Sequence, residues 1–144
     1  MSNSLKKLLE DSKILCLCEG TSEKGVMNLL LDNDELVFTR EQFNLKKVYK
    51  ENNRIKNKTC LTTPEIEILV IINENALEEY YKVKSKKPPS EFCKQNLKMN
   101  DIKKDSSIDK YFNCDSKKLI NAIKIYNTKS NGNDYGIYHL IKNS

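Results

Sequence analysis

The chain has 144 residues, a length that fits one domain, and 38% of them are hydrophobic, which is enough for a thin core. Charged residues make up 31%, so much of the chain must be solvated surface, and 25 Lys and Arg against 20 Asp and Glu leave a net charge of +5. This mild basic excess is compatible with nucleic acid or with an acidic protein surface as a partner. The longest apolar runs are too short to cross a bilayer and no targeting signal is visible, so we expect a cytoplasmic protein.

The five cysteines do not match a zinc motif, because zinc sites usually pair two cysteines two residues apart near further Cys or His. Cys16 and Cys18 alternate with leucines in an apolar run, so we interpret them as core thiols. Cys93 and Cys114 are expected to be half-buried packing residues. Reduced cysteines agree with a cytosolic setting.

The first elements predict an α/β portion over residues 1–62. A short amphipathic helix is expected over Ser4–Asp11, and the continuous apolar run Ile14–Cys18 is typical of a strand covered on both faces. Thr21 or Ser22 can cap the helix that follows. Leu36–Phe38 then predicts a second short strand, and the order strand, helix, strand favours a parallel βαβ unit.

Residues 44–58 form the most basic segment, with six cations against the single acid Glu51. We interpret it as a polar helix or loop on the surface, followed by a third strand edge at Thr59–Leu61. Basic side chains interleaved with an aromatic can contact a phosphate backbone and stack on a base, although a solvated surface helix explains the pattern equally well. A second basic run, Lys82–Lys87, would extend the footprint if it lies on the same side. The candidate residues for binding nucleic acid or another partner are Lys46, Lys47, Tyr49, Lys50, Arg54, Lys56 and Lys58.

Residues 63–144 predict a mostly helical portion. Thr63-Pro64-Glu65 begins a helix that runs to about Tyr81, since Pro suits the first helical position and acids suit the first turn. Ile68–Ile72 is also rich in β-branched residues, so a buried strand is the alternative. Further helices are expected over Pro88–Leu97, after Asp115-Ser116, and over Tyr135–Ile141.

These elements together predict an α/β fold. We expect a small, mainly parallel sheet of about three short strands in the N-terminal half, packed with helices, and a mostly α-helical C-terminal half, all within one domain.

The turn Glu19-Gly20 is the sharpest candidate for chemistry. A carboxylate at the carboxyl end of a parallel strand lies where such sheets bind ligands, and its oxygens suit Mg²⁺. A turn carboxylate that caps the next helix is the simpler interpretation, as it is for first-turn acids such as Glu65 and Glu67. His139 has no partner motif, and no Ser-His-Asp, Cys-His or Walker pattern is present. The candidate metal ligands are Glu19, Glu23 and Glu74, and the candidate catalytic residues of an enzyme are Glu19 and Glu65.

Ile14–Glu23 resembles the first motif of the Toprim domain, in its OLD-nuclease and bacterial-defence branch, where an apolar strand ends in Glu-Gly and a further Glu often follows. Thr63–Glu67 resembles an acidic, Pro-containing segment downstream in small Toprim-like proteins. The resemblance is to the first half of the chain and implies a Toprim-like fold with Mg²⁺-dependent nuclease or phosphotransfer chemistry. Toprim enzymes also carry an acidic pair at the end of a later strand, and between Phe38 and Pro64 this chain has the basic segment instead.

The resemblance without the acidic pair implies a non-catalytic binding protein that acts by occupying a surface of nucleic acid or of a nucleic-acid-binding complex. Because the resembling families act largely in conflict between phages and bacteria, it points to an inhibitor or regulator of a nucleic-acid-targeting defence system, of the anti-CRISPR type. The Lys-, Asn- and Ile-rich composition suggests an AT-rich genome, as in many phages and mobile elements. One alternative is a Mg²⁺-dependent nuclease that uses Glu19, and another is a structural subunit of a larger complex.

Overall fold

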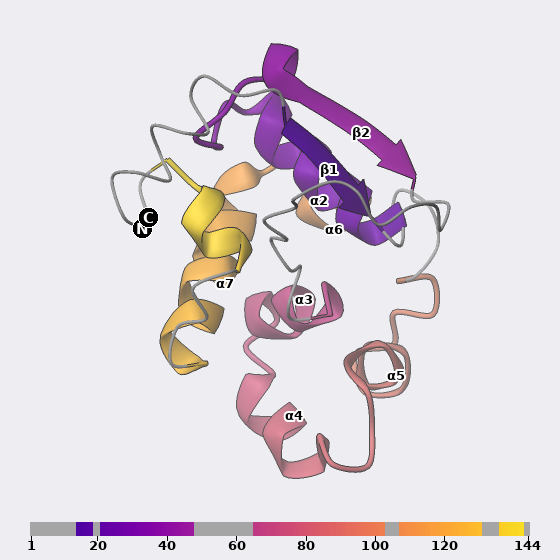
Figure 1. Cartoon of the computed structure of the whole chain (residues 1–144). Helices are drawn as coiled ribbons and strands as arrows, with labels where there is room; N and C mark the ends of the chain where they lie inside the picture. The colour runs from indigo at the N-terminus through magenta and orange to yellow at the C-terminus, as the bar shows by residue number, and fades with distance from the viewer. Residues whose placement is uncertain (1–13, 19–20, 48–64, 103–106, 131–135, 143–144) are drawn as a thin grey trace, which may run out of the picture.

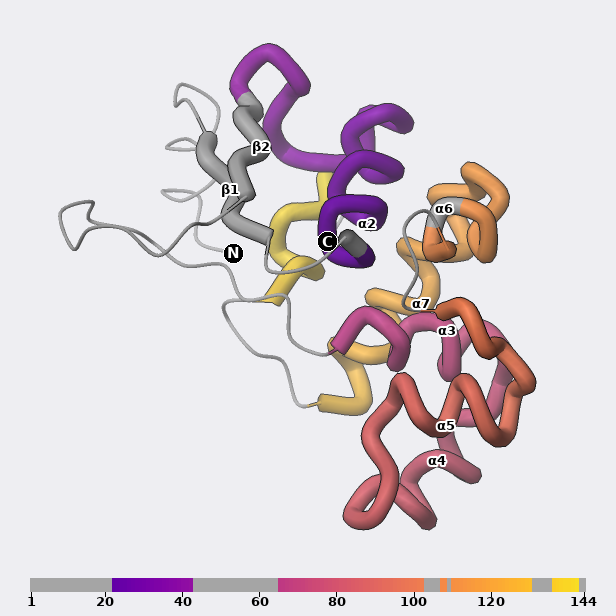
Figure 2. The backbone as a smooth tube through the Cα atoms, turned by 90° about the vertical axis from the view of Figure 1, so that its right-hand side faces the viewer, coloured from indigo at the N-terminus to yellow at the C-terminus, as the bar shows by residue number. Residues whose placement is uncertain are grey.

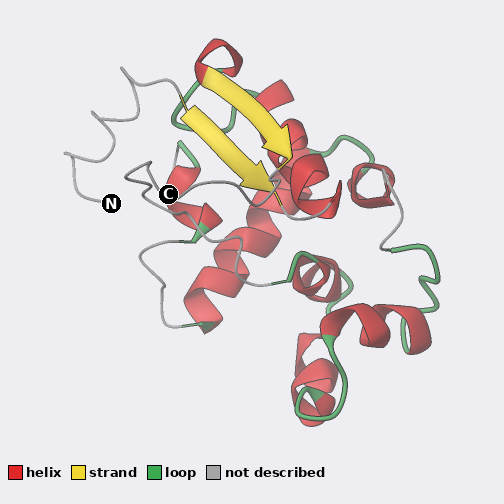
Figure 3. Cartoon of the chain, turned by 45° about the vertical axis from the view of Figure 1, so that its right-hand side comes forward, coloured by secondary structure: helices red, strands yellow, loops and turns green. Residues whose placement is uncertain are grey.

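The computed structural model describes residues 14–18, 21–47, 65–102, 107–130 and 136–142, and for residues 14–18, 21, 43–47 and 109 it describes the backbone alone. Helices dominate these ranges (Figure 3). The strands are β1 (Ile14–Cys18) and β2 (Phe43–Lys47). The helices are α2 (Thr21–Asp32), α3 (Glu67–Asn73), α4 (Leu77–Val83), α5 (Pro89–Gln95), α6 (Ser107–Phe112) and α7 (Ser116–Lys129). The 3-10 turns are η1 (Arg40–Gln42) and η2 (Ile137–Leu140).

The expected mainly parallel sheet of about three strands is wrong. In the described ranges β1 pairs in parallel with β2 alone, and β2 lies where a polar helix or loop was predicted. The expected strand Leu36–Phe38 is also wrong: Leu36 forms an isolated antiparallel bridge with Ile141. Two paired strands are too few to support a fold, so the helices must do so, and the α/β, Toprim-like architecture implied by the opening motif is not the one these residues form.

Helix α3 is buried on every side. Glu67 through Ile72 are all buried, and Val70 and Ile71 are completely so. A run that is apolar on every face of a helix belongs in a core, which explains why periodicity alone left a strand over Ile68–Ile72 as an open alternative. The strand interpretation of Ile68–Ile72 is therefore wrong, and the helix interpretation is confirmed.

The long helix expected from Pro64 to Tyr81 is two helices separated by a break. Asn75 has φ 56°, a left-handed conformation that Asn tolerates better than most residues, and it ends α3. Beyond the break, α4 places Leu77 and Tyr80 in the core. The break thus turns the chain so that a second helix can bury its own apolar side.

Two of the expected helix starts are confirmed. Pro89 occupies the first turn of α5, and the Asp115 side chain caps α7 by accepting hydrogen bonds from the backbone N–H groups of Lys117 and Lys118 at 3.0 and 3.3 Å. Helix α6 was not predicted, and the helix expected over Tyr135–Ile141 is only the 3-10 turn η2.

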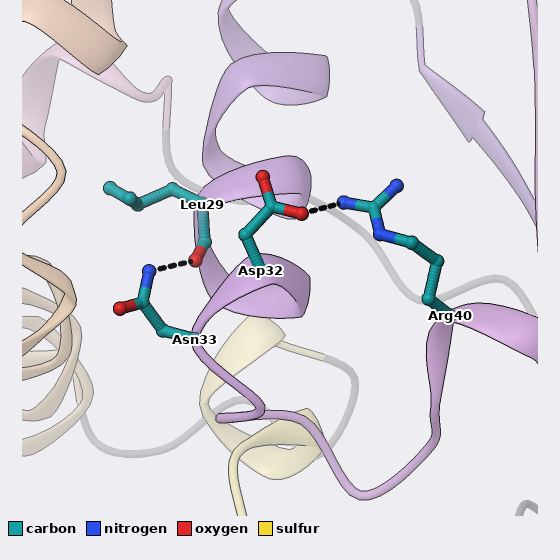
Figure 4. Close-up of polar contacts among 4 residues, drawn as sticks. All are labelled: Leu29, Asp32, Asn33 and Arg40. Carbon is teal, nitrogen blue, oxygen red and sulfur yellow. Dashed lines mark hydrogen bonds and ion pairs between the residues drawn. The ribbon is translucent and has the colours of Figure 1, made fainter.

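The end of α2 is held by two side-chain contacts (Figure 4). Asn33 Nδ2 donates to the Leu29 carbonyl at 2.8 Å, and Arg40 pairs with Asp32. The chain then returns beside the C-terminal segment, where the Val37 N–H donates to the Leu140 carbonyl at 2.8 Å. Residues from opposite ends of the sequence therefore close one side of the core.

The helices surround α3. Helices α7, α5 and α4 pack against it, while α2 packs against α6 and β1. The strand pair lies at one end of the molecule and α4 at the other (Figures 1 and 2). One cluster of buried side chains runs from Val26 in α2 to Ile141 near the C-terminus. Within the described ranges, the helices are too short or too polar to cross a membrane.

Candidate nucleic-acid interface

Most of the basic segment first proposed as the interface lies outside the described residues, namely Tyr49, Lys50, Arg54, Lys56 and Lys58. Lys46 and Lys47 belong to β2, so their backbone is extended and not helical as expected. Glu19, the first candidate ligand and catalytic residue, also lies outside the described residues.

The other candidate carboxylates come from separate elements. Glu23 is in the first turn of α2, Glu65 precedes α3 and is exposed, and Glu74 follows α3. Across the described ranges, no three His, Cys, Asp or Glu side chains gather in a group that could hold a metal ion. Glu23, Glu65 and Glu74 therefore do not come together in one group of this kind.

Glu74 has a structural contact instead. The Tyr111 hydroxyl donates to Glu74 Oε1 at 2.6 Å and accepts from Asn73 Nδ2 at 2.7 Å. Burial, followed by the hydrogen bond to Glu74, raises the pKa of Tyr111 above its usual value. The three side chains tie α6 to the end of α3.

The side chains of Cys93 and Cys114 are described and differ from one another, whereas those of Cys16 and Cys18, expected to be core thiols, lie outside the description. Cys93 is completely buried, and its Sγ donates to the Glu67 carbonyl at 3.7 Å. Burial and then the nearby charge of Glu67 raise the pKa of Cys93 to about 12, so its thiol stays protonated near neutral pH and is a poor nucleophile. Cys114 is exposed, which corrects the expectation of a half-buried packing residue. His139 contacts the ring of Tyr138, with the centroids 5.2 Å apart.

The described beginning of the first basic run and the second run lie at opposite ends of the molecule (Figure 1). Lys46 and Lys47 are on β2 at one end, and Lys82 is on α4 at the other (Figure 1). The run Lys82–Lys87 therefore cannot extend a footprint on β2, and it has to be considered as a surface of its own.

This second run continues into α5. Residues 82–98 contain six lysines and one acid, Glu91, whose carboxylate accepts a hydrogen bond from Gln95 Nε2 at 2.6 Å. All of the lysines are exposed except Lys87, which is half-buried. Within the described ranges, none of them forms an ion pair with a carboxylate. We call these residues the α4–α5 basic surface: Lys82, Lys84, Lys86, Lys87, Lys94 and Lys98.

The core fixes the two helices that carry these lysines. Tyr80 of α4 and Phe92 of α5 are 5% and 1% exposed, and their rings meet edge to face with centroids 5.3 Å apart. Between the helices, the Lys86 and Lys87 N–H groups both donate to the Val83 carbonyl, at 2.9 and 3.0 Å. Lys87 Nζ then reaches Asn96 Oδ1 at 3.0 Å. Lys86 and Lys87 therefore lie on a connection between α4 and α5 whose backbone is held by these hydrogen bonds.

An open hollow of about 470 Å³ lies beside α5. Its charged lining residues are Lys94 and Glu91, and both are exposed. The hollow is therefore a depression in the basic surface and does not resemble an enclosed small-molecule site. It is lined by Pro88, Ser90, Glu91, Lys94, Gln95, Asn100 and Ile102.

Two tyrosines adjoin the basic surface. The ammonium group of Lys84 lies 4.9 Å from the centroid of the Tyr81 ring, a cation–π contact. Helix α7 reaches the same place, because Lys129 Nζ contacts Glu78 Oε1 at 3.0 Å. On α4, Tyr81 lies three residues after Glu78, and on α7, Tyr126 lies three residues before Lys129. Residues three apart share one face of a helix, so this ion pair brings together the helix faces that carry the two tyrosines.

Four residues on or beside this surface were not predicted from the sequence, namely Tyr81, Lys94, Lys98 and Tyr126. The excess of basic over acidic residues across residues 82–98 was a usable signal for Lys94 and Lys98, since it equals that of residues 44–58. No local signal links Tyr126 to Tyr81, because their proximity depends on how α7 crosses α3.

Comparisons with protein-family models, with curated proteins and with solved structures gave no match for this chain.

Proposed function

We propose that this protein is a non-catalytic binding protein that binds nucleic acid through the α4–α5 basic surface. By this proposal it acts in the cytoplasm as an inhibitor or regulator of a nucleic-acid-targeting defence system. The choice of a defence system rests on the likeness of Ile14–Glu23 to proteins of bacterial defence and on the Lys-, Asn- and Ile-rich composition.

The observation that carries the proposal is the group of six lysines without ion-paired carboxylates in the described part of the chain. A lysine already paired with an acid gains little from a phosphate, whereas an unpaired lysine releases the counterions condensed on the nucleic acid when it binds. The lysines also stand on helices fixed by Tyr80 and Phe92, so little backbone order has to be acquired on binding.

A Mg²⁺-dependent nuclease that uses Glu19 is the second candidate function. The carboxylates that would assist Glu19 come from different elements, and this dispersal favours binding over cleavage. A protein that only binds should leave a labelled oligonucleotide intact in Mg²⁺, and its affinity should not depend on EDTA. Cleavage that EDTA abolishes and Glu19→Ala removes would support the nuclease instead.

The proposal predicts that binding weakens steeply with salt. For a single strand, the logarithm of the association constant falls by about 0.7 per phosphate contact for each tenfold rise in salt. With three to six of the lysines engaged, we expect a slope of about −2 to −4. Fluorescence anisotropy of a labelled 20-nucleotide probe between 50 and 300 mM KCl measures it. Binding that is independent of salt, or no binding at 50 mM KCl, would contradict the proposal, and capture of a protein complex in the latter case would favour a protein target.

A further inference from the structure

We propose that the α4–α5 basic surface takes single-stranded nucleic acid in preference to duplex, with bases stacking on Tyr81 and Tyr126 while the lysines contact phosphates. The inference rests on the proposed function, because it specifies the class of nucleic acid that the same surface binds.

The first support is the platform formed by the tyrosines. Both rings are half-exposed and pack against the core on their other side. Tyr81 is backed by Tyr80, with ring centroids 6.3 Å apart, and Tyr80 is in turn held by Phe92. A ring held in this way loses little rotamer freedom when a base stacks on it, and every base offers a flat face to such a ring.

The second support is the closeness of cations to the rings. The Lys84 ammonium lies over the Tyr81 ring, 4.9 Å from its centroid, so a base that stacks there displaces this ammonium, which can then contact the phosphate of the same nucleotide. The ion pair of Lys129 with Glu78 brings the end of α7 beside α4. A nucleotide places its base and its phosphate only a few bonds apart. An aromatic ring and an ammonium group at this spacing can therefore contact the base and the phosphate of one nucleotide. The base must be unpaired and unstacked to reach the ring, as it can be in a single strand but not in a duplex.

The third support is the position of the acids. Glu78 and Glu79 are exposed in the first half of α4, whereas the lysines begin in its second half and continue around the turn into α5. Glu78 is paired with Lys129, so Glu79 is the carboxylate that would repel the phosphates of a stiff duplex laid along α4. A flexible strand can follow the lysines around the turn and avoid Glu79, so repulsion disfavours the duplex more.

The test compares a labelled 20-nucleotide strand of mixed sequence with a hairpin duplex of the same number of phosphates, by anisotropy at 100 mM KCl. We expect the single strand to bind about tenfold more tightly, and Tyr81→Leu with Tyr126→Leu to lose about tenfold or more for the strand while hardly changing the hairpin. The matched variants Tyr81→Phe and Tyr126→Phe, which keep the rings, should retain the affinity. Thermal unfolding by circular dichroism confirms that each variant is folded.

The outcomes separate the two proposals. Equal or tighter binding of the hairpin, or full affinity in the folded leucine double variant, would overturn the preference for single strands and leave the proposed function standing. If neither probe binds, both proposals fall. Loss of strand binding in the phenylalanine variants would show that the hydroxyl groups matter and not the rings, and it too would overturn the stacking proposal.

Discussion

Replacing Lys82, Lys84 and Lys86 together by glutamate should weaken binding of a single-stranded probe by about 100-fold at 0.1 M salt. Each phosphate contact with a single strand raises the association constant by about 0.7 log units when the salt concentration falls tenfold, from 1 M to 0.1 M. Losing three contacts therefore lowers the association constant at 0.1 M salt by about two orders of magnitude. The slope of log affinity against log salt should become shallower by about two. All three lysines are exposed and outside the core, so the fold should be unaffected. Anisotropy titrations at several salt concentrations give both quantities.

The matched control makes the same charge change elsewhere. Lys24 is exposed in the first turn of α2, and Lys117 and Lys118 are exposed in the first turn of α7, where acids interact favourably with the helix dipole. Both helix starts lie away from α4 (Figure 1). Lys24→Glu, Lys117→Glu and Lys118→Glu together should cost much less affinity. An equal loss in both triple variants would show that net charge, and not the α4–α5 basic surface, drives binding.

The basic segment that the sequence first suggested offers a second comparison. Lys46→Glu with Lys50→Glu is predicted to weaken binding if that segment contacts nucleic acid. A larger loss in this double variant than in the Lys82, Lys84 and Lys86 variant would place the interface at the strand end of the molecule and contradict our assignment.

Replacing Phe92 by alanine should lower the free energy of unfolding by about 3–5 kcal/mol. Phe92 is 1% exposed, lies edge to face against Tyr80, and links α5 to the buried helix α3 through its neighbour Cys93. The substitution removes most of a ring and leaves a cavity that the surrounding helices can fill only in part. Urea unfolding followed by circular dichroism measures the change as a lower midpoint at an unchanged slope.

Gln95→Ala is the control for Phe92→Ala on the same helix. Gln95 is exposed and its side chain donates a hydrogen bond to the exposed Glu91, so the change should stay within about 0.5 kcal/mol. A loss below about 1 kcal/mol in Phe92→Ala would mean that α5 is not anchored as described. The α4–α5 basic surface would then have no fixed scaffold.

The helix starts were the most predictable part of the fold. Asp115 before α7 and Pro89 in α5 act through contacts within one turn, so their effect is visible in the local sequence. The buried helix α3 was only half predictable. Its apolar side chains face neighbours in every direction, and such a run has neither a helical nor a strand period.

The extended parts of the chain were mostly mispredicted because their state is set by distant partners. Leu36 meets Ile141 across more than one hundred residues, and one bridge is all that forms there. Phe43–Lys47 carries lysines that suit a surface helix, yet it pairs with β1. Backbone pairing of this kind depends on which strand is available, and the side chains of the segment do not encode that.

The candidate site could be predicted in part. The lysines of residues 82–87 are a contiguous run, so composition alone identified them. Their separation from Lys46 and Lys47, and the approach of the α7 face that carries Tyr126 to α4, follow from how the helices pack around α3. Sequence spacing carries no information on either point.

We place the contact with nucleic acid at the α4–α5 basic surface. A titration of ¹⁵N-labelled protein with the single-stranded 20-nucleotide probe, followed by amide chemical shifts, tests this placement directly. We expect the amides of Tyr81 and of the residues in 82–98 other than the two prolines to shift together with those at the end of α7, while those of β2 do not. Shifts confined to residues 43–58, or shifts absent throughout, would contradict it.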